Sequence, residues 1–209
     1  MFSTYIVPLS ILIPILIGLF NFKLLTKGAK LLLTYLILSG LINLCGIILV
    51  AHKMRNLPLL HVYTIVETVL VINYLKSLFR EPLIKKILLA ITILFPLVCI
   101  INFSFFQSIF TYNTYTRPLE AILITFFCLL YFYKNAFTEN WINKPESWFN
   151  MGILIYFPVV CIIFILSNYM AFVIKNKAMN SLVWQAHAAL VMVMYLIWAR
   201  GFSLFKHGR

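Results

Sequence analysis

Long apolar stretches separated by short polar segments follow one another along the whole chain. Seven of them approach or exceed the length of about 20 residues that a helix needs to cross a bilayer. They cover roughly residues 5–22, 29–51, 59–79, 87–106, 117–137, 148–173 and 181–205. Because no segment between them is long enough for a soluble domain, the pattern predicts one all-α membrane domain over residues 1–209, a polytopic bundle of seven transmembrane helices.

The composition supports a membrane protein. Of the 209 residues, 63% are hydrophobic, and the charged residues are 17 Lys or Arg and only 5 Glu. A soluble domain carries roughly a quarter charged residues and under half apolar ones, so a cytosolic globular enzyme and a disordered tail are excluded. The net charge of +12 comes from basic residues scattered between the apolar runs, as in the loops of multi-pass proteins. Nucleic acid is therefore not expected as a partner.

The distribution of Lys and Arg predicts the orientation, because cytoplasmic loops are enriched in basic residues. With the N-terminus outside, twelve would lie on the inner side: Lys23, Lys27, Lys30, Lys76, Arg80, Lys85, Lys86, Lys134, Lys144, Arg200, Lys206 and Arg209. Five would lie on the outer side: Lys53, Arg55, Arg117, Lys175 and Lys177. We therefore expect an outer N-terminus and an inner C-terminus in the cytoplasmic membrane of a bacterium.

Four ionisable residues fall at membrane depth, where such groups are costly and usually face a protein interior or a watery cavity. They are His61, Glu67, Glu120 and His187. The stretches that contain them all begin on the predicted outer side. At 1.5 Å per residue, all four residues lie in the outer half of the bilayer, so they have the depth needed to form one cluster.

Helical periodicity extends this cluster. Tyr63 and Glu67 share one face of the stretch 59–79, and Thr64 lies between His61 and Glu67. A helix with so broad a polar arc is expected at the centre of the bundle. Trp184 and Gln185 lie about one turn from His187 in the last stretch. The sequence thus predicts an outward-facing polar cavity formed by His61, Tyr63, Thr64, Glu67, Glu120, Trp184, Gln185 and His187.

The leading functional interpretation is a sensor or receptor that binds a small ligand in this cavity. The 11 Tyr and 4 Trp of the chain supply amphipathic walls for such a ligand. The loops are too short to contain an output domain. A sensor of this kind would therefore need a separate signalling partner in the cytoplasm or the membrane, besides the lipid bilayer itself.

Three alternatives use the same residues. His61, Glu67, Glu120 and His187 are residue types that ligate Zn or Fe, as in a membrane hydrolase acting on lipid, although no H-E-x-x-H motif is present. His61 and His187 also suit the two axial positions of haem. A proton-coupled transporter would use Glu67 as its relay, without visible internal repeats.

A purely structural interpretation is also open. Glu67 would then be hydrogen-bonded to Tyr63, His61 to Thr64, and Glu120 paired with Arg117 three residues earlier. The four cysteines lie inside apolar stretches without a C-x-x-C motif, which favours packing over disulfides or zinc. These cysteines are Cys45, Cys99, Cys128 and Cys161.

Several segments together resemble a known group of proteins. They are His61-Val-Tyr-Thr-Ile-Val-Glu67, Asn113-Thr-Tyr-Thr-Arg-Pro-Leu-Glu120, Trp148-Phe and Ile155-Tyr156. This combination resembles small bacterial seven-helix integral membrane proteins of unassigned function, over most of the chain. The resemblance implies that His61, Tyr63, Glu67 and Glu120 form a recurrent constellation, but it implies no particular activity.

Overall fold

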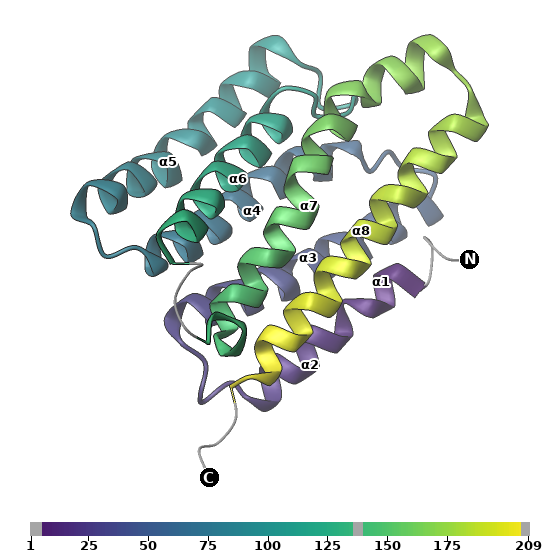
Figure 1. Ribbon diagram of the computed structural model, residues 1–209. Helices are drawn as coiled ribbons and strands as arrows, with labels where there is room; N and C mark the ends of the chain where they lie inside the picture. The colour runs from purple at the N-terminus through teal and green to yellow at the C-terminus, as the bar shows by residue number, and fades with distance from the viewer. Residues whose placement is uncertain (1–5, 136–139, 206–209) are drawn as a thin grey trace.

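The computed structural model describes residues 6–135 and 140–205, and every regular element in these two ranges is helical. The chain runs back and forth along one common direction (Figure 1). The α-helices are α1 (Val7–Ser10), α2 (Leu12–Phe20), α3 (Lys27–Ala51), α4 (Leu57–Leu78), α5 (Pro82–Ile101), α6 (Thr116–Asn135), α7 (Pro145–Asn168) and α8 (Lys177–Ser203). A π-helical segment continues α5 over Asn102–Phe106 and another continues α7 over Tyr169–Ile174, while Trp141–Asn143 forms a short 3₁₀ helix.

Six helical segments are long and apolar enough to cross a membrane, which is typical of a multi-pass membrane protein. The first predicted stretch, 5–22, contains only α1 and α2, which together extend over Val7–Phe20. At 1.5 Å per residue they span about 21 Å, less than the bilayer core of about 30 Å. The seventh span is thus not shown and stays a prediction. Residues 5 and 136–137 of the predicted stretches, with Lys206 and Arg209 of the charge count, lie outside the described residues.

The six long helices begin one to five residues earlier than the apolar pattern predicts, because caps and prolines add a first turn that the apolar pattern does not include. Thr26 accepts a hydrogen bond from the backbone N–H of Ala29 at 3.2 Å, and Asn176 does the same for Met179 at 3.1 Å. These are N-cap interactions. Proline occupies the first turn of α4, α5 and α7, where its missing N–H costs nothing.

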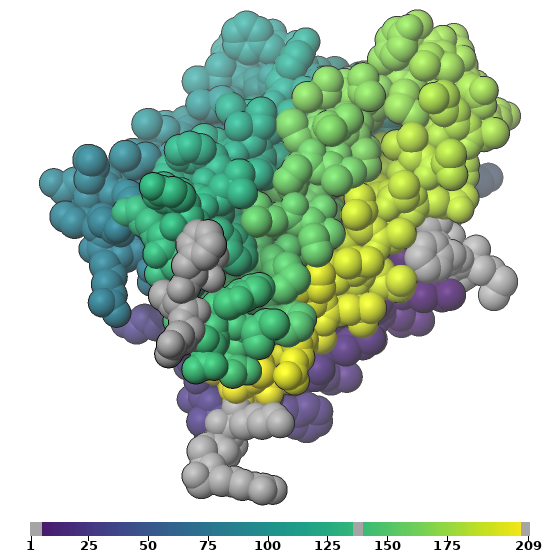
Figure 2. All heavy atoms as spheres, in the orientation of Figure 1, coloured from purple at the N-terminus to yellow at the C-terminus, as the bar shows by residue number. Residues whose placement is uncertain are grey.

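The helices pack as a bundle in which neighbours in sequence are mostly neighbours in space. α4 packs against α3, α5 and α6, while α7 packs against α6 and α8. The short α2 lies between α8 and α3 and completes the ring. Figure 2 shows α7 between α6 and α8 on the visible face. The three neighbours of α4 agree with the central position that its polar arc predicts.

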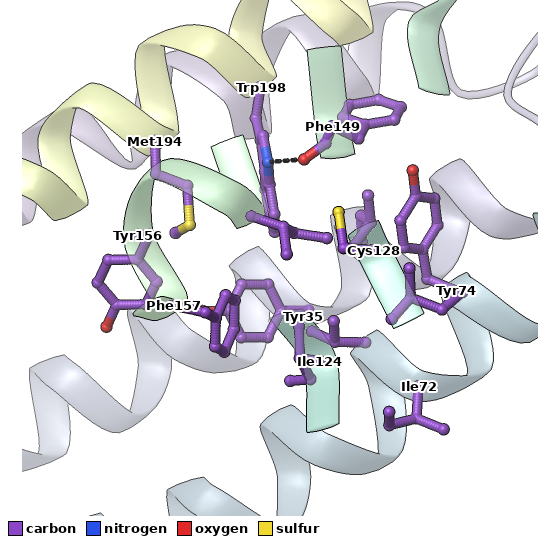
Figure 3. Packing of buried hydrophobic residues seen from close by; sticks show 14 of the residues in the cluster. Tyr35, Ile72, Tyr74, Ile124, Cys128, Phe149, Tyr156, Phe157, Met194 and Trp198 are labelled. Carbon is purple, nitrogen blue, oxygen red and sulfur yellow. Dashed lines mark hydrogen bonds between the residues drawn. The ribbon is translucent and has the colours of Figure 1, made fainter. Parts of the chain in front are cut away.

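An aromatic cluster fills the core between α3, α4, α7 and α8 (Figure 3). Trp198 is completely buried, and its indole N–H donates a hydrogen bond of 2.9 Å to the backbone carbonyl of Phe149. The outer surface is apolar instead: Phe20, Phe105 and Tyr133 are each at least 80% exposed. Such a surface suits lipid. All four cysteines are free thiols, in agreement with the prediction that they do not form disulfides.

One exposed ion pair joins the predicted inner ends of α5 and α6. The ammonium of Lys134 contacts the carboxylate of Glu81, and both side chains are partly exposed. This hydrogen bond lowers the pKa of Glu81 from its usual value. Because the pair lies in contact with solvent, its contribution to stability is small.

Candidate functional site

A buried arginine with two carboxylates lies at the centre of the bundle. Arg117, in the first turn of α6, is only 3% exposed, and Glu67 and Glu120 are completely buried. One guanidinium nitrogen contacts a carboxylate oxygen of Glu67 and lies 2.6 Å from one of Glu120. Since an isolated buried charge is very costly, each of the three residues depends on the others. The predicted Glu120–Arg117 pair is therefore present, although it is buried and includes Glu67.

Hydroxyl groups complete the surroundings of both carboxylates. Glu67 accepts hydrogen bonds from Tyr35 of α3 at 2.6 Å and from Tyr63 at 3.2 Å. Glu120 accepts one from Thr68 of α4 at 2.8 Å. The predicted bond between Tyr63 and Glu67 is confirmed. These contacts tie α3, α4 and α6 together through polar groups in the interior of an otherwise apolar protein.

Asn113 fixes the start of α6 and therefore the position of Arg117. Its side-chain oxygen accepts hydrogen bonds from the backbone N–H of Thr116 at 3.1 Å and of Arg117 at 3.3 Å. Its amide nitrogen donates to the hydroxyl of Thr64 at 3.1 Å. The first turn of α6 is thereby attached to α4, and Arg117 is directed into the bundle.

Tyr156 extends the network to α7 and α8. Its hydroxyl accepts a hydrogen bond from Arg117 at 3.3 Å and lies 3.3 Å from the Nε2 atom of His187. The rings of Tyr156 and His187 are also in contact, with centroids 5.8 Å apart. Five helices thus contribute to one continuous polar network.

A cavity of about 250 Å³ borders this network between α1, α3, α4, α7 and α8, with Ile11 from the junction of α1 and α2. Its polar lining consists of Tyr35, Asn43, Tyr63, Tyr156, His187 and Tyr195. Its apolar lining consists of Val7, Pro8, Ile11, Ile42, Leu60, Ala188, Val191 and Met194. Glu67 and Arg117 lie behind the tyrosines rather than on the cavity wall, so among the described residues the lining contains no Asp, Glu, Lys or Arg.

Five of the eight predicted cavity residues belong to this arrangement. Tyr63 and His187 line the cavity itself. Thr64, Glu67 and Glu120 belong to the hydrogen-bonded network behind it. The prediction that these residues, distant in sequence, come together is correct, while the assignment of Thr64, Glu67 and Glu120 to the cavity wall is wrong.

The remaining three predicted residues lie elsewhere. His61 places Nε2 3.2 Å from the backbone oxygen of Thr111 in the loop before α6, so its predicted bond to Thr64 is wrong. Trp184 stacks on Tyr112 with ring centroids 5.2 Å apart and touches His187 only from outside the cavity.

Gln185 is exposed and donates to the hydroxyl of Ser181 at 3.0 Å. At about 100° per residue, Gln185 lies some 200° round the helix from His187, which explains why the two cannot share a wall. Sequence proximity on α8 was therefore a poor guide to cavity lining.

The four predicted metal ligands do not come together. Glu67 and Glu120 are both paired with Arg117, while His61 contacts the Thr111 carbonyl and His187 contacts Tyr156. In residues 6–135 and 140–205, no three His, Cys, Asp or Glu side chains are grouped so that they could hold a metal ion. The prediction that these four residues together ligate Zn or Fe is therefore wrong. His61 and His187 also face different surroundings, so the predicted axial pair for haem is not formed.

Four residues that the predicted cavity does not include are central to the site. The charge count places Arg117 on the outer side, where it begins an apolar stretch, and only its pairing with Glu120 is predicted. Tyr35, Tyr156 and Tyr195 lie within long apolar stretches, and the only signal they offered was a phenol hydroxyl at membrane depth. Buried tyrosines usually find a hydrogen-bond partner, so these residues were detectable as candidates but not as partners of one another.

Comparison with known proteins does not assign the chain to a family. No protein-family model, no curated protein and no solved structure matches the chain. The resemblance to small bacterial seven-helix membrane proteins therefore stays a prediction. The function has to be inferred from the cavity and the network themselves.

Proposed function

We propose that this protein is a membrane receptor whose cavity binds a small, uncharged, amphipathic molecule. The observation that carries the proposal is the 250 Å³ cavity, with four tyrosines and His187 on its wall. A cavity with a mostly apolar lining and a few convergent polar groups is the usual form of a small-molecule site.

The lining indicates the chemistry of the ligand. Phenol hydroxyls and an imidazole both donate and accept hydrogen bonds, so they suit an alcohol, a carbonyl or an amide. Charged side chains do not reach the wall, and the two carboxylates behind it are already engaged by Arg117 and by hydroxyl donors. The volume lies just below the range of roughly 300–1,000 Å³ typical of ligand pockets. A compact neutral molecule is therefore the expected occupant.

The network supplies a route from the cavity to the helices. Tyr35 and Tyr63 face the cavity and also bind Glu67, while Tyr156 faces it and binds Arg117. A ligand that accepts a hydrogen bond from one of these phenols would alter the bond between that phenol and Glu67 or Arg117. These bonds connect α4, α6 and α7 to the cavity wall. A ligand shifts a conformational equilibrium by its differential affinity for the two states, and here the differential contacts would be these phenol bonds.

The proposed topology gives the cavity an outward position. We infer seven spans, with α1 and α2 as the first, an outer N-terminus and an inner C-terminus in a bacterial cytoplasmic membrane. This orientation is supported by the excess of Lys and Arg at the end of the bundle that contains Lys27, Lys76 and Lys85. A signalling partner would then contact the inner face.

Filling the cavity is expected to abolish ligand binding without unfolding the protein. Val191 of α8 lines the cavity and is only partly buried, so Val191→Phe places a ring in the ligand volume. Leu196→Phe is the matched control, because Leu196 lies on the same helix and is 47% exposed. Small organic molecules extracted from the purified proteins would be compared by mass spectrometry. A compound enriched in the wild type and the control but depleted in Val191→Phe supports the proposal; three identical extracts contradict it.

Proton-coupled transport is the second candidate, and one specific observation favours it. Two buried carboxylates share one guanidinium, and the Tyr35–Tyr63 contact of 2.7 Å connects Glu67 to the cavity. Such a chain can carry a proton to a buried carboxylate. If it does, an imposed pH gradient should decay faster across liposomes that contain the protein than across empty ones, and Glu67→Gln should remove the difference. Equal decay in the first two samples contradicts transport.

A further inference from the structure

A second recess lies at the opposite end of the bundle from the tyrosine cavity, between α3, α4 and α5. Its volume is about 570 Å³. Four lysines line it: Lys27 at the start of α3, Lys76 near the end of α4, and Lys85 and Lys86 in the first turn of α5. The remaining lining residues are Leu31, Asn73, Ser77 and Leu89. We call these eight residues the lysine groove.

The positive charges of the lysine groove are not neutralised within the part of the chain that the structure describes. The ion pairs in that part involve Arg117 and Lys134, and none involves a groove lysine. No Asp or Glu lines the groove. Of the four groove lysines, only Lys85 also lines a neighbouring recess, which contains Glu81 and Glu146. Because four lysines and no acidic residue line it, the lysine groove is electropositive.

The surroundings of the lysine groove are apolar along the helix axes. Leu31 and Leu89 lie in the groove on the side toward the middle of α3 and α5. Beyond them, α5 presents exposed residues such as Ile93, which is 59% exposed. The groove is thus charged at the end of the bundle where three candidate membrane spans begin or end, and apolar toward the middle of these spans. This order of polarity is the same as in a phospholipid.

We propose that the lysine groove is a binding site for an anionic phospholipid, with the phosphate held by the lysines and an acyl chain lying against Leu31 and Leu89. Basic pockets between transmembrane helices bind anionic headgroups on the cytoplasmic side. Lysine suits this role because its ammonium is a mobile point charge on an apolar stem that can extend to the headgroup level. In the proposed topology the groove faces the inner leaflet.

The apolar half of the lysine groove distinguishes a lipid from free phosphate. Inorganic phosphate would use the lysines alone, and its binding would not depend on the acyl chain. A phospholipid would use both halves, because its phosphate would contact the lysines and its acyl chain would lie against Leu31 and Leu89. The class of ligand is therefore phosphatidylglycerol or a related anionic phospholipid.

The test uses the intact protein purified in detergent, with bound lipids counted by native mass spectrometry. Phosphatidylglycerol should bind at least about tenfold more tightly than phosphatidylcholine, since each basic residue contributes about 1 kcal/mol toward an anionic surface. The triple variant Lys76→Gln/Lys85→Gln/Lys86→Gln should lose this preference. The charge-matched control Lys53→Gln/Lys175→Gln/Lys177→Gln, at the opposite end of the bundle, should retain it.

Several outcomes would overturn the assignment. Equal binding of the two lipids by the wild type would do so without the need for any variant. Loss of the preference in both triple variants would indicate a general effect of net charge. Complete displacement of phosphatidylglycerol by millimolar inorganic phosphate would identify an anion site without a lipid component.

Discussion

Arg117→Met is expected to be the most damaging single substitution in the described chain, because it leaves Glu67 and Glu120 buried together without a cation. Both carboxylates are completely buried, and both contact the same guanidinium. Removal of one partner from a buried ion pair costs about 3–5 kcal/mol, and here two carboxylates lose their partner at once. A methionine of similar length fills the space but supplies no charge. The variant should therefore yield little folded protein.

The number of charges explains which substitutions should restore stability. Glu67→Gln or Glu120→Gln alone leaves one carboxylate beside one guanidinium, so each should be tolerated better than Arg117→Met. The triple variant Glu67→Gln/Arg117→Met/Glu120→Gln removes every charge of the cluster. Replacing a complete buried ion network by neutral groups is often nearly neutral for stability, so the triple variant should be more stable than the single Arg117→Met.

Thermal unfolding in detergent, followed by tryptophan fluorescence to which the buried Trp198 contributes, measures these differences. Lys134→Met is the control, because it removes the partly exposed pair with Glu81 and should cost less than about 1 kcal/mol. If Arg117→Met unfolds at the same temperature as Lys134→Met, the cluster does not stabilise the bundle. If the triple variant is no better than Arg117→Met, the loss is due to packing and not to unpaired charge.

The helices were largely predictable because length and hydropathy determine them locally. Six of the seven predicted stretches correspond to long helices, and their ends differ by a few residues where a cap or a proline adds a polar first turn. The exception, 5–22, is interrupted between α1 and α2. Hydropathy alone did not distinguish this short pair from a helix of full length.

The site was only partly predictable because it depends on which side chains meet across helices. Depth along each helix brought Glu67, Glu120 and His187 correctly into one layer. It did not reveal Arg117, whose position at the end of an apolar stretch is also that of an outer-loop residue. The direction of Arg117 depends on the hydrogen bonds of Asn113 at the start of α6. Such contacts do not follow a periodic pattern in the sequence. The sequence therefore predicts Arg117 as the partner of Glu120 and not of Glu67.

The second large effect is expected at Gly152, where Trp198 of α8 packs closely against α7. A Cβ atom at Gly152 would lie 2.5 Å from Nε1 and 2.6 Å from Cδ1 of Trp198. Small residues allow such close packing between membrane helices. The indole has little room to withdraw, because Trp198 is completely buried and its N–H is bonded to the carbonyl of Phe149 at 2.9 Å.

Gly152→Ala should therefore lower the free energy of unfolding by about 1–5 kcal/mol, which is the sum of two costs less the gain of about 1 kcal/mol for alanine over glycine in a helix. Overpacking a core costs about 1–3 kcal/mol, and displacement of the indole leaves a buried polar group unpaired at a cost of about 1–3 kcal/mol. Gly40→Ala is the matched control, since a Cβ at Gly40 meets only Ile11, at 3.9 and 4.0 Å. Alanine is favoured over glycine in a helix by about 1 kcal/mol, so the control should be unchanged or slightly more stable. In a thermal unfolding experiment, Gly152→Ala should lose stability while Gly40→Ala does not, and equal shifts would refute the packing explanation.

Gly152 also connects core packing to the proposed ligand site. The same Cβ would lie 3.3 Å from Cγ of Met194, which lines the cavity, and Tyr156 of the cavity wall is one turn further along α7. Movement of α8 away from α7 would alter the contact of 3.3 Å between Tyr156 and His187. Gly152→Ala should thus reduce both stability and the amount of bound compound, whereas Val191→Phe should reduce only the bound compound. If Gly152→Ala keeps its compound while losing stability, the spacing between α7 and α8 does not determine the shape of the cavity.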